Sequence, residues 1–296
     1  MNAAQTIIDG VALGAIYALV AIGLALVFGV MRLVNFAHGE LITAGGYTLA
    51  LTMDWPLAAS LVMCFAVCVT LAVVMEKVAF RPLRGAAPMT TLTATFAVAF
   101  TLEAVWLVAF GPQGKPVSSL TRLNTPISQT GDLNLRWVTI VMIAAGIGLL
   151  AGTALFLNRT SLGLQMRAAA VDFRTARLLG VRADVVISFS FVLAGIFAAV
   201  VAILLTVQQP LVTPQFGLEL TILALVGVVV GGLDRLWTAT LGGFAIGFAN
   251  SVLGALLSSS NRVFLSTFVF LLVIVVLLLR PSGLFAPFRA PASERV

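Results

Sequence analysis

The stretch Arg32-Leu-Val-Asn-Phe-Ala-His-Gly-Glu40 decides the fold of this chain. It places an asparagine, a glutamate and the only histidine of the sequence between apolar segments that are long enough to cross a bilayer. A charged side chain at bilayer depth costs about 2.5–3.5 kcal/mol, so ionisable residues there usually face a cavity, a partner or a pathway. The stretch therefore favours a transport role.

The composition excludes an ordinary soluble domain, because 60% of the 296 residues are hydrophobic and only 9% are charged. A membrane span needs roughly 20 apolar residues, and Gly10–Met31, Trp55–Met75 and Trp137–Asn158 are free of charge throughout. In lipid, every backbone amide must be satisfied within the protein, which leaves helices for such segments. We expect an all-α, polytopic integral membrane protein, forming a single domain over residues 1–296 with its first span retained.

The charge pattern predicts about nine transmembrane helices, of which two are short. The nine expected spans are 9–31, 38–54, 55–76, 88–110, 137–157, 185–207, 217–234, 237–258 and 262–280. Each short span has an uncharged stretch opened by a glutamate, 41–53 after Glu40 and 220–233 after Glu219. At 1.5 Å per residue, such a stretch covers about 20 Å of a core of about 30 Å.

The two short spans also suggest an internal duplication. Glycines lie in both, and the residues around them echo one another, as in Leu24-Ala-Leu-Val27 and Leu223-Ala-Leu-Val226. Paired short helices in two halves of a transporter are the best sequence indication of a binding site at the midplane. Chance similarity between apolar segments is the other interpretation.

Basic residues predict the orientation. Thirteen lie in one set of loops and four in the opposite set, which makes the first set cytoplasmic by the positive-inside rule. The N-terminus is then outside and the C-terminus cytoplasmic. Loop 111–136 is expected to be extracytoplasmic, whereas loop 159–184 and the tail 281–296 are expected to be cytoplasmic.

The cytoplasmic loop 159–184 reads as a partner-binding element. Residues 168–180 predict a short helix with Asp172 as its N-cap and Gly180 as its left-handed stop. Exposed leucines beside arginines favour a docking surface for a partner protein. The expected docking residues are Arg167, Asp172, Arg174, Arg177, Leu178, Leu179 and Gly180. An interfacial helix lying on anionic lipid is the alternative.

The sequence predicts no energy source, metal site or nucleic-acid site of its own. Gly111-Pro-Gln-Gly-Lys-Pro116 lacks the spacing of a nucleotide-binding loop, so nucleotide must be hydrolysed elsewhere. Cys64 and Cys68 share a helix face but have no histidine or carboxylate beside them, and we interpret them as small buried hydrophobes. The net charge of +6 comes from basic residues in the predicted loops, as expected for a membrane protein.

The ordered motifs of the chain resemble a known family, the permease subunits of branched-chain amino acid ABC importers, of the LivH type. The resemblance covers nearly the whole chain. It is carried by Gly14-Ala-Ile-Tyr17, Val34-Asn-Phe-Ala-His-Gly-Glu40, Phe80-Arg-Pro-Leu-Arg-Gly85, Ala176-Arg-Leu-Leu-Gly180 and Leu279-Arg-Pro-Ser-Gly-Leu-Phe285. One departure is Asp172-Phe-Arg-Thr-Ala176, which stands where the family usually has Asp-Arg-Glu-Ala.

The resemblance implies a permease in the bacterial inner membrane that is not itself an enzyme. Its implied partners are a second permease of the LivM type, two ATP-binding subunits that hold ATP and Mg²⁺, and a periplasmic substrate-binding protein. It also implies alternating access for branched-chain or other hydrophobic amino acids, and that loop 159–184 docks into an ATPase. Relatives that carry urea, short amides or aromatic acids leave the substrate open. A self-contained carrier or channel, or a membrane scaffold, would belong to other classes.

The candidate substrate path is formed by Asn35, Phe36, His38, Glu40 and Glu219. Asn35 and His38 are expected either to hydrogen-bond a passing zwitterion or to hold the bend between two helices. The two glutamates are expected either to meet the substrate's ammonium group or to pair with an arginine. Because an unpaired buried charge is costly and Arg32 is within reach of Glu40, we expect a structural role for Glu40.

Overall fold

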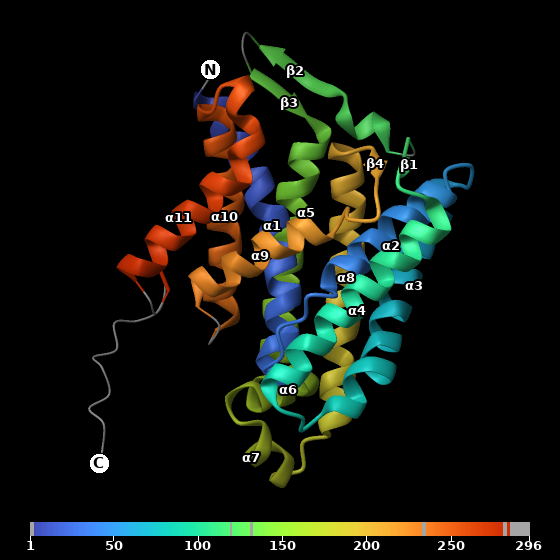
Figure 1. Ribbon diagram of the computed structural model, residues 1–296, viewed down its shortest axis with the longest axis vertical. Helices are drawn as coiled ribbons and strands as arrows, with labels where there is room; N and C mark the ends of the chain where they lie inside the picture. Colours follow the sequence, from blue (N-terminus) through green and yellow to red (C-terminus); the bar gives the residue numbers. More distant parts are fainter. Residues whose placement is uncertain (1–2, 119, 131–132, 233–234, 281–282, 285–296) are drawn as a thin grey trace.

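Long apolar helices make up most of the computed structural model, which describes residues 3–118, 120–130, 133–232, 235–280 and 283–284. Figure 1 shows them as a bundle with two small strand pairs at one end and the shortest helix, α7, at the other. The α-helices are α1 Ala3–Met31, α2 His38–Leu51, α3 Leu57–Val74, α4 Pro88–Phe110, α5 Trp137–Arg159, α6 Ser161–Val171, α7 Phe173–Leu178, α8 Ala183–Gln208, α9 Leu218–Gly231, α10 Leu236–Leu256 and α11 Leu265–Leu279.

Seven helical segments within the described ranges are long and apolar enough to cross a membrane. They contain α1, α3, α4, α5, α8, α10 and α11. The two predicted short spans are also helical, but α2 and α9 have only 14 residues each. Helicity in all nine predicted segments is therefore confirmed, whereas the count of nine crossings and the internal duplication stay predictions.

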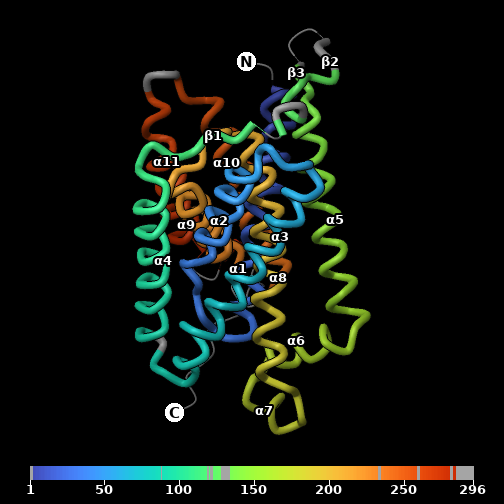
Figure 2. Tube along the Cα trace, turned by 90° about the vertical axis from the view of Figure 1, so that its right-hand side faces the viewer, coloured from blue at the N-terminus to red at the C-terminus, as the bar shows by residue number. Residues whose placement is uncertain are grey.

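Helix α1 lies at the centre of the bundle. It packs along α10 on one side and α8 on the other, and most of its residues are buried. Small residues permit the close approach, since a Cβ atom at Gly247 would lie 2.8 Å from the Cα of Gly14. Figure 2 shows α5 at the edge of the bundle and α6 and α7 at one end. The outer helices α4 and α11 have largely exposed apolar surfaces.

The all-α prediction misses two small antiparallel strand pairs. Strand β1, Lys115–Pro116, pairs with β4, Leu211–Val212, and β2, Pro126–Thr130, pairs with β3, Leu133–Arg136. All four lie at the end opposite α7 (Figure 1). Helix is obligatory only where lipid prevents a backbone amide from reaching water, so these connecting segments are free to form strands.

Short helical turns complete the connections between the long helices. A π-helical turn, Met75–Phe80, and a 3₁₀ turn, Arg81–Leu83, extend α3, while the 3₁₀ turns Thr121–Asn124 and Ser259–Phe264 precede β2 and α11. The short helix predicted between the Asp172 N-cap and the Gly180 stop is present as α7, and residues 168–171 before it belong to the separate helix α6. The Asp172 carboxylate accepts hydrogen bonds from the backbone N–H groups of Arg174 and Thr175, which interrupts the helical pattern after Val171. Of the predicted tail 281–296, only 283–284 lie within the described residues.

Candidate functional site

The two short helices meet at their N-terminal ends inside the bundle. A Cβ atom at Gly39, near the start of α2, would lie 2.8 Å from the carbonyl oxygen of Gly217, which precedes α9. The N–H of Gly217 donates to Oγ1 of Thr43 at 3.0 Å, and that hydroxyl donates to the carbonyl of Gly39 at 3.2 Å. Figure 1 shows α2 and α9 running away from this junction in opposite directions. The junction therefore brings two helix N-termini, with their positive dipole ends, to one place.

Residues 35–38 hold the bend between α1 and α2. The side-chain oxygen of Asn35 accepts a hydrogen bond from the N–H of Ala37 at 3.1 Å, and Phe36 stacks on Phe96 of α4 with ring centroids 3.9 Å apart. His38 is fully buried, and its ring occupies the space beside Gly23 of α1, where a Cβ atom would lie 2.9 Å from its Cε1. Each of these contacts supports the structural role considered for Asn35 and His38.

Glu40 does not pair with Arg32, the arginine that the sequence places within its reach. Its buried carboxylate instead accepts a hydrogen bond from Nε1 of Trp106 at 2.9 Å. Arg32 has a left-handed backbone conformation, with φ of 53°, and its guanidinium donates to the carbonyl of Ala170 at 2.9 Å. The backbone turn at Arg32 directs its side chain toward α6, whereas Glu40 faces α4.

Glu219 lies in the first turn of α9 and is exposed beside a cavity of about 580 Å³. The hydroxyl of Ser266 on α11 donates to its carboxylate at 3.4 Å. The apolar wall of this cavity includes Leu211, Phe216, Ile222, Leu223 and Phe270. A cavity of this size, with an apolar wall and a few polar groups, has the properties of a small-molecule site.

Among the polar residues at this cavity that the sequence did not predict are Gln215 and Ser266. The side-chain amide of Gln215 donates to Glu103 of α4 at 2.8 Å, which links α4 to the loop before α9. A signal was present in each case, because both residues are polar and lie within or beside an apolar segment. The position of neither residue in the sequence revealed that it would line the cavity beside Glu219.

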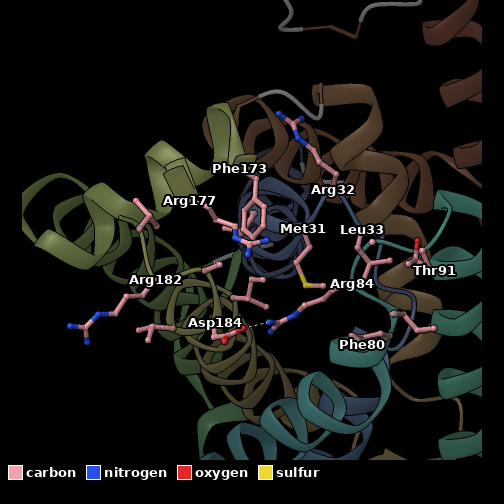
Figure 3. A pocket seen from close by; sticks show the side chains of 18 residues that line it. Met31, Arg32, Leu33, Phe80, Arg84, Thr91, Phe173, Arg177, Arg182 and Asp184 are labelled. Atoms are coloured by element: carbon pink, nitrogen blue, oxygen red, sulfur yellow. Dashed lines mark hydrogen bonds and ion pairs between the residues drawn. The ribbon is translucent and has the colours of Figure 1, made fainter. Parts of the chain in front are cut away.

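A larger cavity, of about 900 Å³, lies at the α7 end of the molecule (Figure 3). Phe173 and Arg177 of the predicted docking helix line it. Across the cavity, Arg84 forms ion pairs with Glu76, whose side chain is 1% exposed, and with Asp184 at the start of α8. Figure 3 shows Arg84 directed toward Asp184, and Arg81 joins the same carboxylate at 3.6 Å. This ion-pair network joins the end of α3 to α8. The sequence did not predict it.

Helix α7 presents the predicted docking residues at the surface. Leu178 is 84% exposed and Leu179 is 81% exposed, while Arg174 and Arg177 are exposed beside them. Gly180 ends the segment with φ of 91°, as predicted. Hydrogen bonds from the Thr175 side chain and backbone lower the pKa of the Asp172 carboxyl below its ordinary value. Arg167 lies apart on α6, where it donates to the side chain of Asn158 at 3.0 Å.

A helical membrane bundle with two short helices meeting end to end, and a largely apolar cavity that holds a few polar groups beside one of them, defines a transport protein of the permease class. The fold is similar to that of a chain of PsaBC from Streptococcus pneumoniae in complex with Fab, with a TM-score of 0.53 and 14% identity over 94% of this chain and 91% of that chain.

The sequence comparisons identify the family. Residues 6–278 match the family model described as branched-chain amino acid transport system / permease component, and the chain belongs to this family. It is 30% identical to the high-affinity branched-chain amino acid transport system permease protein BraD of Pseudomonas aeruginosa, over 99% of this chain and 97% of that protein. It is 29% identical to the permease protein LivH of Escherichia coli, with the same coverage.

Proposed function

We propose that this chain forms part of the membrane path of an ATP-driven, binding-protein-dependent importer for branched-chain or other hydrophobic amino acids. Full-length similarity to permeases of branched-chain amino acid transport systems supports the proposal. The observation that carries it is the position of Glu219, an exposed carboxylate beside a cavity within a bundle of apolar helices. A carboxylate facing hydrocarbon would be costly, so water, substrate or a partner must face it.

The cavity beside Glu219 suits a hydrophobic amino acid. In this proposal the Glu219 carboxylate binds the substrate's ammonium group while the hydroxyl of Ser266 donates to Glu219, and the amide of Gln209 donates to the substrate's carboxylate. The apolar wall receives the aliphatic side chain. Asn35, Phe36, His38 and Glu40 hold the junction of α2 with α1 and α4, and of the five candidate path residues only Glu219 meets the substrate.

The exposed face of α4, α9 and α11 is where a second permease subunit would pack. Glu103 and Glu219 both lie toward this face, and neither would be stable against lipid alone. A second subunit of the LivM type would enclose the cavity and complete the path. Alternating access would then move the two permeases about the junction of α2 and α9.

The α7 end of the molecule is proposed to face the cytoplasm of a bacterium, with the N-terminus outside and the C-terminus inside. The excess of basic residues in the loops at the α7 end supports this orientation. ATP and Mg²⁺ would be held by two partner subunits, one of which docks on Leu178 and Leu179 with the flanking arginines. The cavity lined by Phe173 and Arg177 lies beside this surface and would accept a projecting side chain of the ATPase.

Reconstitution with the partner subunits tests the function. Proteoliposomes containing the whole complex should accumulate leucine only when ATP and the binding protein are present. Glu219→Gln should lower uptake at least tenfold, while Asp54→Asn, which removes an exposed carboxylate between α2 and α3, should leave it unchanged. Uptake without ATP would indicate a self-contained carrier, and normal uptake by the Glu219 variant would exclude its role in the path.

A further inference from the structure

A groove of about 330 Å³ lies between α1, α5, α6 and α10, away from the cavity beside Glu219. Its apolar wall comes mainly from Ile22 of α1 and from Leu150, Ala154 and Leu157 of α5. Three arginines lie along its lining as well, Arg32, Arg167 and Arg235. We refer to this feature, with its apolar wall and its three arginines, as the α5 groove.

The three arginines come from three different parts of the chain. Arg32 follows α1, Arg167 lies within α6 and Arg235 immediately precedes α10. Arg32 donates to a backbone carbonyl and Arg167 to the neutral side chain of Asn158, so neither contact neutralises charge. No acidic side chain lines the groove within the part of the chain that the structure describes. Three positive charges therefore converge on a site whose described protein partners are neutral.

The backbone of Arg32 has an uncommon, left-handed conformation, which bears on where its charge lies. Its φ of 53° is the single positive value at a non-glycine residue within the described ranges. A left-handed conformation is costly for a residue with a Cβ atom, and strain of this kind concentrates at functional sites. Figure 3 shows the Arg32 side chain turned away from Arg84 and Asp184. The turn thus directs its charge to the α5 groove and away from the ion-pair network.

The surroundings of the groove are those of a membrane interface. Trp237 lines it with 60% of its surface exposed, and Leu155, which follows the groove residue Ala154 on α5, is 61% exposed. Tryptophan is enriched where acyl chains meet headgroups, and an exposed leucine on a peripheral helix suits lipid. Figure 2 shows α5 at the periphery of the bundle. The apolar wall continues along the helices from the arginines toward the membrane interior.

We propose that the α5 groove binds one anionic phospholipid, with its phosphate held by Arg32, Arg167 and Arg235 and an acyl chain lying against Ile22, Leu150 and Leu157. Basic pockets between helices at the cytoplasmic side of a membrane recognise such headgroups. The guanidinium fork binds phosphate oxygens in two parallel hydrogen bonds. The bound lipid joins α6 to α1 and α10, and so braces the segment that leads into α7.

Lipid titration of the purified, full-length chain in detergent tests the proposal. Native mass spectrometry should show dioleoylphosphatidylglycerol bound at least tenfold more tightly than dioleoylphosphatidylcholine. The double variant Arg167→Gln with Arg235→Gln should lose this preference while its weak phosphatidylcholine binding is unchanged, which also shows that it is folded. The matched control Lys77→Gln with Arg182→Gln removes the same charge from exposed positions outside the groove and should keep the preference.

A second variant separates a lipid from free phosphate. Ala154→Phe fills the apolar wall without changing charge and should weaken phosphatidylglycerol binding at least fivefold. Full binding by this variant would show that no acyl chain lies in the groove and would overturn the proposal. Displacement of the lipid by millimolar inorganic phosphate would overturn it too, by indicating a simple anion site. Equal affinity of the wild-type protein for both lipids would have the same consequence.

Discussion

Gly217 and Gly39 approach so closely that a Cβ atom on Gly217 would overlap the carbonyl oxygen of Gly39. The contact joins the residue before α9 to the first turn of α2, although the two are far apart in sequence. The atoms in the way belong to the backbone, so they cannot move aside as the end of a flexible side chain could. The junction of the two short helices therefore depends on the absence of side chains at both positions.

Gly217→Ala is expected to destabilise the protein by about 3 kcal/mol or more, because the methyl group would push two helix ends apart. Gly152→Ala is the matched control. No atom lies within 4 Å of the position its Cβ would occupy on α5, so its effect should stay within about 1 kcal/mol and can be stabilising. Thermal unfolding in detergent distinguishes the two, and similar midpoints for both variants would contradict the expected overlap.

Arg84→Ala is expected to cost about 3–5 kcal/mol, because it leaves the buried carboxylate of Glu76 without its ion pair. Asp184→Asn removes the other carboxylate of the same network. That side chain is 66% exposed, so the loss should be below about 1 kcal/mol. Denaturation in detergent measures both variants. Equal losses would mean that burial of Glu76 does not control the strength of the network.

Trp106→Phe is expected to destabilise the protein by about 1–3 kcal/mol, since it removes the indole N–H that donates to the buried Glu40 carboxylate. Trp237→Phe makes the same chemical change at an exposed position and should alter stability by less than about 0.5 kcal/mol. The effect of Trp106→Phe should shrink in a Glu40→Met background. An undiminished effect there would show that ring packing, and not the hydrogen bond, is responsible.

The Asp172 carboxyl is expected to titrate below its ordinary pKa of 3.8, because the Thr175 hydroxyl donates to it at 2.5 Å. A lowered pKa in the folded protein means that the charged cap stabilises α7 fully above pH 3.8, and that this contribution is lost as pH falls through the lowered value. Thr175→Val should raise the pKa toward 3.8, while Thr175→Ser should keep it low. Carbon-13 NMR of labelled aspartate measures the titration, and an unchanged pKa in the valine variant would refute the assignment.

The sequence predicts the helices well, because apolar runs between charges leave no alternative in lipid. Local signals also predict the ends of α7, where Asp172 and Gly180 act through their own backbone neighbourhoods. Signals of this kind depend on residues a few positions apart. They need no knowledge of which helices pack together.

Contacts between segments that are distant in the sequence could not be predicted from such local signals. Glu40 was expected near Arg32, eight residues away, but its hydrogen-bond donor is Trp106 on another helix. The network of Glu76, Arg84 and Asp184 likewise joins two helices whose packing the sequence does not reveal. Glu219 was identified as a candidate from its position in an apolar run, yet the neighbours that form its cavity come from the fold.

The pairing of β1 with β4 joins two distant segments of the chain at one end of the molecule. The N–H of Val117 also donates to the carbonyl of Pro210 at 2.9 Å, so the segment after α4 is fastened to the segment before α9 by backbone bonds. These bonds must break before α4 and α9 can separate at the strand end. An opening between the two helices would therefore be smallest beside β1 and β4 and would grow with distance from this strand pair.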